Sequence, residues 1–220
     1  MPGGPSWLGS AAGLCLPSRQ RLRALWDHNF LPDVGPFSQR NPQGRPYALP
    51  GDAGMIMSAN VTGDPEAFGN AQSWQNGYFN EYMSCFEHQV ASHLIAEGMV
   101  TKGLALTHAI HQRYHAAKRN PFNGVGCSDH YARAVAGYGS FITICGFIYH
   151  DPSGHLGLTP RLMGDFQAAF TTAEGWGTMT LRGKTVTLTV RSGTVTLHSL
   201  TVHGQTKTFE TPLVVASGGV

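Results

Sequence analysis

The chain has 220 residues, of which 41% are apolar and 13% are charged, and its formal net charge is +2. This length is sufficient for one sizeable core, or for one domain with an appendage. The apolar content argues against a wholly disordered chain. The scattered basic residues argue against a nucleic-acid partner, because a nucleic-acid surface needs clustered Lys and Arg.

Signals for membranes, secretion and metals are weak. The longest uncharged apolar run, Phe141 to Tyr149, has about half the length of a membrane-spanning helix, so no membrane span is expected. The N-terminus has no basic residues ahead of its apolar ones, which disfavours a signal peptide and suggests an arbitrary start to a truncated reading frame. The four cysteines show no CxxC spacing. We expect a reducing, cytoplasmic setting, with no metal and no cofactor.

Helical periodicity dominates the chain up to residue 172. The exception is a long connection, residues 32–78, which is rich in Pro, Gly and Asn. A short joint at Gly98 predicts that the helices on either side of it form an antiparallel hairpin. The helix after that hairpin is apolar nearly all round, so it should be buried. The expected helices span residues 18–30, 80–98, 101–118, 128–149 and 166–172.

The period of the sequence changes to two beyond Trp176. Thr alternates with Leu and Val over residues 178–202, and two Gly-containing triplets, 182–184 and 191–193, read as turns. This pattern predicts a β-meander, to which residues 206–216 are expected to add one more strand. The expected fold class is therefore α+β, with helices first and strands last.

The loop and helix start within residues 118–147 hold the densest group of chemically capable side chains. Loops that lead into helix N-termini often present functional groups. A Cys–His nucleophile is conceivable here, but catalytic partners are usually distant in the chain. Helix physics alone also explains an acid beside a Ser N-cap. The candidates in this stretch are Cys127, Asp129, His130, Tyr131 and Arg133.

Other candidates lie outside this loop. Glycoside hydrolysis needs two carboxylates that flank a sugar, and Glu81, Glu87 and Asp129 attract attention for that role. Glu81 stands at a helix start, whereas Glu87 lies mid-helix, where a solvated or ion-paired side chain is the simpler interpretation. His108, His111 and His115 would share one helix face and could hold a metal. A polar face that includes Gln112, Arg113 and Lys118 is the alternative explanation of that spacing.

One long segment resembles a known family. Residues 87–139, EHQVASHLIAEGMVTKGLALTHAIHQRYHAAKRNPFNGVGCSDHYARAVAGYG, resemble the C-terminal half of glycoside hydrolase family 116, the non-lysosomal glucosylceramidase-like and bacterial β-glucosidase-like enzymes. The resemblance runs from about Leu16 to about Val202 and includes the KRNP segment, the C-x-D-H-Y-A-R segment and the AEGWG turn. These motifs are specific only in combination.

The resemblance implies a retaining β-glycosidase. Residues 1–172 would then be an incomplete part of an (α/α)6 catalytic barrel, and residues 173–220 a C-terminal β-meander. The family's two catalytic carboxylates would lie upstream of the matched segment, so no catalytic residue is expected here. The family's N-E-x-E-C loop corresponds to residues 123–127, with Gly124 and Gly126 at both Glu positions.

The residues that the resemblance assigns to a sugar cleft bind substrate rather than cleave it. Arg133 corresponds to a hydroxyl-binding Arg of the family, and Glu81 to the acid that precedes the QVA helix. The expected substrate-binding residues are Arg133, Glu81, Asp129, His130 and Tyr131. Tyr131 and Tyr138 could stack on a sugar ring.

Three hypotheses follow. In the first, the chain is a C-terminal part of a glycosidase that is inactive alone, and its partners are a β-glucoside or glycolipid-type sugar and a missing N-terminal half. Such a part would expose an apolar patch where the neighbouring helices are absent. In the second, it is a non-catalytic carbohydrate-binding or structural module that uses the β-meander as its surface. In the third, its helical histidines bind a metal.

Overall fold

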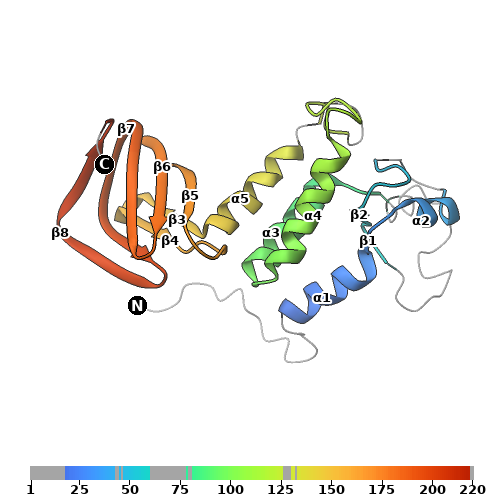
Figure 1. Cartoon of the computed structure of the whole chain (residues 1–220), viewed down its shortest axis with the longest axis horizontal. Helices are drawn as coiled ribbons and strands as arrows, with labels where there is room; N and C mark the ends of the chain where they lie inside the picture. The colour runs from blue at the N-terminus through green and yellow to red at the C-terminus, as the bar shows by residue number, and fades with distance from the viewer. Residues whose placement is uncertain are drawn as a thin grey trace, which may run out of the picture.

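A computed structural model of the chain describes residues 18–42, 45, 47–59, 78, 81–125, 130–131 and 133–218. These residues form two regions that lie side by side along the long axis (Figure 1). The helical lobe contains the described residues from Ser18 to Ala136, and the strand lobe begins at Phe147. Between them, α5 (Gly137–Cys145) leads from one lobe into the other.

The helical lobe contains four α-helices and a short strand pair among its described residues. Its helices are α1 (Ser18–Asn29), α2 (Gly35–Arg40), α3 (Ser84–Ala96) and α4 (Val100–Arg113), and a 3-10 turn, η2 (Arg133–Ala136), precedes α5. Its strands, β1 (Phe30–Leu31) and β2 (Gly54–Met55), are antiparallel. Strand β2 lies within the long connection, residues 32–78, and its Met55 is buried.

The pair of helices α3 and α4 confirms the predicted hairpin. Gly98 ends α3 in a left-handed conformation, with φ of 78°, which glycine adopts at no steric cost. The two helices then pack backbone to backbone at Gly103. A Cβ at Gly103 would lie 2.6 Å from the carbonyl oxygen of Ala91, so no larger residue fits there without displacement.

The strand lobe is a six-stranded, mostly antiparallel sheet that curls into a nearly closed, barrel-like fold. Its strands are β3 (Phe147–His150), β4 (His155–Leu158), β5 (Phe166–Thr171), β6 (Gly175–Arg182), β7 (Thr185–Val202) and β8 (Gln205–Ala216), and a 3-10 turn, η3 (Asp151–Ser153), joins β3 to β4. The long strand β7 organises this lobe. Its first half pairs with β6, and its second half pairs with β8 on one side and, in parallel, with β4 on the other.

The main apolar core lies inside the strand lobe. Its fully buried members include Leu156, Leu158, Met179 and Leu197, and Cys145 at the end of α5 closes the cluster from the helical side. Two smaller apolar clusters lie in the helical lobe, one around Val34 and Tyr82 and another around Leu106. No helix among the described residues is both long and apolar enough to cross a bilayer.

The expected fold class is wrong. The described residues do not form part of an (α/α)6 barrel, because the C-terminal region is a barrel-like sheet that begins at Phe147. The predicted helix over residues 128–149 is interrupted at Gly146, which is left-handed with φ of 57°, and β3 follows it. A Cβ at Gly146 would lie 1.9 Å from the carbonyl oxygen of Thr159, so this turn requires glycine.

Two further local predictions are wrong. Residues 166–172 were expected to be helical, but β5 forms there because Phe166, Ala168 and Phe170 alternate toward the apolar core. Residues 191–193 were expected to be a turn, but β7 runs through them and changes its partner there from β6 to β8. The predicted turn at residues 182–184 and the strand over residues 206–216 are confirmed.

Candidate functional site

Glu81, the expected cleft carboxylate, is buried in an ion pair. Its side chain is 2% exposed, and Arg45 donates to both of its oxygens, from Nε to Oε1 at 2.7 Å and from Nη2 to Oε2 at 3.1 Å. The guanidinium of Arg45 also lies over the rings of Tyr47 and Tyr78, 5.3 and 5.0 Å from their centroids. Such a bidentate pair fixes the orientation of the Glu81 side chain and gives it a structural role.

Glu87 forms a second buried ion pair, so the ion-paired interpretation of this residue is confirmed and the solvated one is wrong. Arg113 on α4 is 1% exposed and donates to both oxygens of Glu87, with Nη1 at 3.0 Å from Oε1. The same pair anchors the β2 segment, since Met55 N donates to Glu87 and Arg113 Nη1 donates to the carbonyl of Ala53, both at 2.8 Å. Arg113 therefore does not belong to the predicted polar face.

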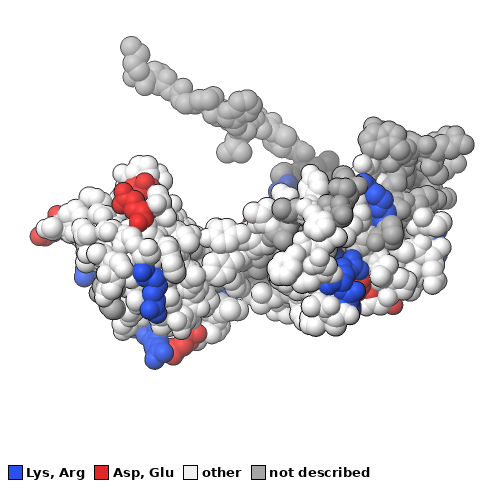
Figure 2. Space-filling view, turned by 90° about the horizontal axis from the view of Figure 1, so that it is seen from above, with Lys and Arg blue, Asp and Glu red and all other residues white. Residues whose placement is uncertain are grey.

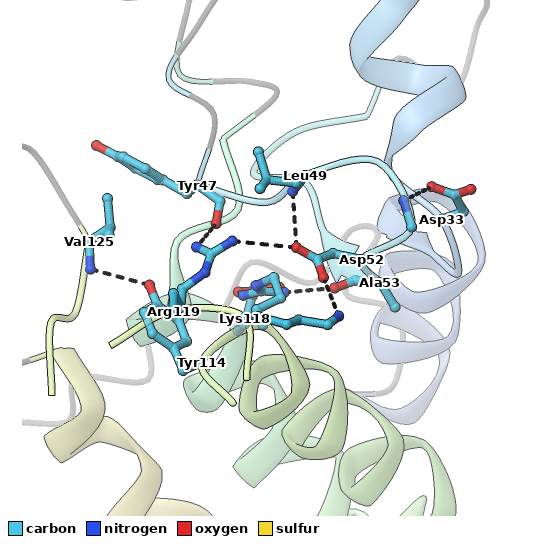
Figure 3. Close-up of polar contacts among 12 residues, drawn as sticks. Asp33, Tyr47, Leu49, Asp52, Ala53, Tyr114, Lys118, Arg119 and Val125 are labelled. Atoms are coloured by element: carbon cyan, nitrogen blue, oxygen red, sulfur yellow. Dashed lines mark hydrogen bonds and ion pairs between the residues drawn. The ribbon is translucent and has the colours of Figure 1, made fainter. Parts of the chain in front are cut away.

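A third cluster surrounds Asp52 and was not predicted (Figure 3). Asp52 is 6% exposed and accepts a hydrogen bond from Lys118 Nζ at 2.8 Å, and Arg119 Nη2 lies 3.6 Å from its other oxygen. Leu49 N donates to the same carboxylate at 3.0 Å. Burial alone would raise the pKa of Asp52, but the hydrogen bonds from Lys118 and Leu49 and the nearby charges hold that pKa below 3.8.

Imidazole and aromatic side chains line a cleft between α3, the end of α4 and the segment that leads into η2. Its volume is about 400 Å³. We call it the His–Tyr cleft, and its imidazole and aromatic lining consists of His88, His111, Tyr114, Phe122, His130 and Tyr131. Phe122 is 89% exposed and Tyr131 is 49% exposed, so the cleft is open on this side. None of the described lining residues is acidic.

Two hydrogen bonds hold the cleft's outer wall in place. Asn123 Oδ1 accepts from the backbone N of His130, and Gly124 O accepts from the backbone N of Tyr131 at 2.7 Å. His130 adopts a left-handed conformation with φ of 52°, which is uncommon for a residue with a side chain. These contacts place the two expected residues His130 and Tyr131 at the cleft and bring them together with His111.

His88 is the inner wall of the cleft, and sequence reasoning missed it. Its side chain is 4% exposed, and its Nδ1 has no hydrogen-bond partner among the described residues. Burial, with the nearby charges of His111 and Arg113, lowers the pKa of His88 from 6.5 to about 4. The imidazole is therefore neutral near pH 7 and can donate or accept a hydrogen bond. In the sequence, His88 is marked only by its position directly after Glu87 on the predicted helix.

The remaining expected residues are less tightly placed. Arg133 begins η2, two residues before the cleft-lining Val135. Cys127 and Asp129 lie outside the described residues, as does Gly126. Glu81 does not line the His–Tyr cleft.

The three histidines of the α4 pattern do not converge. His108 and His111 lie on α4, but the helix ends at Arg113, so His115 lies outside it. His88 and His111 meet edge to face, with ring centroids 6.2 Å apart. Within the described part of the chain, no group of three or more His, Cys, Asp or Glu side chains is arranged to hold a metal.

Neither a scan against protein-family models nor a search of curated proteins finds a match for this chain. The resemblance to glycoside hydrolase family 116 therefore stays a prediction from the motifs. Charged side chains on the face shown in Figure 2 form small, separate groups of both signs, without a continuous basic patch.

Proposed function

We propose that the chain binds a glycoside in the His–Tyr cleft and does not hydrolyse it. The observation that carries this proposal is the lining of the cleft, which combines exposed aromatic rings with imidazoles and has no acid among its described residues. The motif resemblance to β-glucosidases and glucosylceramidases supports a β-glucoside as the ligand, in keeping with a non-catalytic carbohydrate-binding protein.

The side chains of the cleft suit the two faces of a sugar. Tyr131 and Phe122 expose aromatic rings, which bury large apolar area and can pack against the C–H face of a pyranose. His88, whose pKa is held at about 4, keeps a neutral imidazole available for a sugar hydroxyl. A concave site of about 400 Å³ lies within the usual size range of small-molecule pockets.

Hydrolysis would need two carboxylates on opposite sides of the glycosidic bond. The buried carboxylates of the described residues are all engaged elsewhere, Glu81 with Arg45, Glu87 with Arg113 and Asp52 with Lys118. None of these three carboxylates lines the His–Tyr cleft, so none is placed to act on a glycoside bound there. We therefore expect the purified chain to show no turnover of an aryl β-glucoside.

The binding proposal can be tested with a matched pair of tyrosines. Tyr131 lines the cleft, whereas Tyr138 on α5 lies elsewhere and bonds to Thr171, yet both are 49% exposed. Titration of the chain with methyl β-glucoside, followed by NMR or calorimetry, should give saturable binding. Tyr131→Ala should weaken it by about five- to tenfold, from the loss of roughly 1–1.5 kcal/mol of aromatic contact, and Tyr138→Ala should leave it unchanged.

Arg133→Ala provides a second variant for the same titration. Because the resemblance assigns Arg133 to sugar hydroxyls, its removal should weaken binding. The proposal is wrong if no glucoside saturates the chain at millimolar concentration, or if the two tyrosine variants bind alike. Turnover of an aryl β-glucoside by the chain would refute the absence of hydrolysis.

A further inference from the structure

The strand lobe holds an apolar cavity, separate from the His–Tyr cleft. Its volume is about 320 Å³, and we call it the β7–β8 cavity. Six aliphatic side chains line it: Val186, Leu188, Leu197, Leu200, Leu213 and Val215. Leu197 and Leu188 are buried, whereas Leu213 is 42% exposed, so the cavity reaches the surface beside β8.

An irregular pairing of β7 and β8 explains why the cavity is open. Leu197 pairs with Leu213 and Ser199 pairs with Thr208, so that residues 209–212 of β8 lie opposite the single residue His198. Pro212 has no backbone N–H to donate in that stretch. The backbone N atoms of His198 and Ser199 instead both donate to Gly154 O, at 2.8 and 3.3 Å. β8 therefore bulges away from β7 just where the cavity lies.

The cationic side chain of Lys207 belongs to a residue that pairs with the cavity lining. Lys207 is the cross-strand partner of Leu200, and residues that pair across an antiparallel ladder share one face of the sheet. Its Nζ lies over the ring of Phe209, 5.6 Å from the centroid, and Phe209 packs against the strand-lobe core. Lys207 forms no ion pair with any described residue, so its charge is available to a ligand.

We propose that the β7–β8 cavity binds an amphiphilic carboxylate, with its alkyl chain among the aliphatic side chains and its carboxylate at Lys207. Cavities lined mainly by aliphatic groups take up apolar molecules, because burial of each CH2 group contributes about 0.8 kcal/mol. The volume is at the small end of ligand pockets, which favours one unbranched chain over a ring system. The charge of Lys207 selects the anion over a neutral or cationic amphiphile of equal length.

The test is calorimetric titration of the full chain with decanoate below its micelle concentration, with decanol and decylamine as comparison ligands. Decanoate should bind with one site per chain and more tightly than decanol, and decylamine should bind more weakly than decanol. Val186→Phe fills the cavity and should abolish decanoate binding. Circular dichroism and thermal unfolding then show whether this variant keeps its fold.

Exposed lysines give a matched pair that leaves the core intact. Lys207→Met should weaken decanoate by about three- to fivefold, the range for an exposed ion pair, and leave decanol unchanged. Lys184→Met, in the turn between β6 and β7, should change neither. The proposal is overturned if decanoate does not saturate the chain, if Lys207→Met and Lys184→Met bind decanoate alike, or if a folded Val186→Phe variant still binds it.

Discussion

The two lobes are stabilised in different ways. All eight buried polar or charged residues among those described lie between Asn29 and Ser140, in the helical lobe and the first half of α5. The strand lobe instead holds the largest apolar cluster, which has ten buried members from Cys145 to Val215. Figure 1 shows these two regions lying apart, with α5 between them.

This difference separates specificity from bulk stabilisation. A buried ion pair is costly to desolvate and repays that cost only when its geometry is correct, so it fixes one arrangement of α3, α4 and the β2 segment. Apolar burial has no direction and scales with area, so the strand lobe depends on volume and shape. The two lobes should respond differently to charge removal, cavity formation and acid.

The largest effect is expected from Arg113→Met. This change removes the cation from Glu87 and leaves a buried, uncompensated carboxylate, which should cost about 3–5 kcal/mol of unfolding free energy. Urea unfolding gives the total, and hydrogen exchange should locate the loss in α3 and α4, leaving β6 and β7 protected. Arg182→Met, an exposed change on β6, is the control.

A companion variant separates the ion pair from general disruption. Glu87→Met combined with Arg113→Met replaces both charges by apolar groups of similar size, so most of the lost stability should return. Equal destabilisation in the single and double variants would mean that shape, and not charge, is what α3 and α4 need at this point.

Leu197→Ala should have a slightly smaller effect in the opposite lobe. Its side chain is fully buried, and truncation leaves a cavity, which should cost about 3 kcal/mol. Hydrogen exchange should rise in β6, β7 and β8 and stay unchanged in α4. The same truncation at Leu162, which is 43% exposed, should change stability by less than about 0.5 kcal/mol. Loss of protection in both lobes alike would argue that they unfold as one unit.

Acid should act on the helical lobe through His88, and its effect builds up gradually with pH. His88 has its pKa lowered to about 4 in the folded chain and about 6.5 when unfolded, so the unfolded chain binds more protons between these values. Stability should therefore fall as pH decreases from about 6.5 to about 4. His88→Gln should reduce the change of the urea unfolding midpoint between pH 6.5 and pH 4. The control His198→Gln, in the strand lobe, should leave that pH dependence as it is in the original chain.

The helical hairpin could be predicted from the sequence because the residues that determine it lie close together in the chain. Gly98 marks the end of α3, and Gly103 permits the close approach of α4. The strands were harder to place. A helix can tolerate a glycine such as Gly146, and the contact that ends the helix there comes from Thr159, thirteen residues later in the chain. The resemblance to a family with a helical barrel also favoured helices in residues 147–172. These residues form strands instead, because their apolar side chains alternate toward the strand-lobe core.

The candidate site was only partly predictable for the same reason. His130 and Tyr131 were chosen for their chemistry in one loop, and the structure places both at a cleft. The partners of the buried carboxylates, however, lie 36 residues away for Glu81, 26 for Glu87 and 66 for Asp52. Nothing in a single sequence identifies which distant cation a given carboxylate meets, so Glu81 could be selected but its engagement with Arg45 could not.

Helix α5 connects the two kinds of core. In the first half of α5, Ser140 Oγ lies 3.2 Å from Ser92 Oγ of α3. At the end of α5, Cys145 is 1% exposed and belongs to the strand-lobe core. Burial raises the pKa of the Cys145 thiol to about 11, so almost none of it is thiolate at neutral pH. Alkylating reagents can therefore modify Cys145 only when the strand lobe opens, whereas Cys85 on α3 is partly exposed. The rate at which Cys145 is modified, relative to the rate for Cys85, therefore reports how often the strand-lobe core opens.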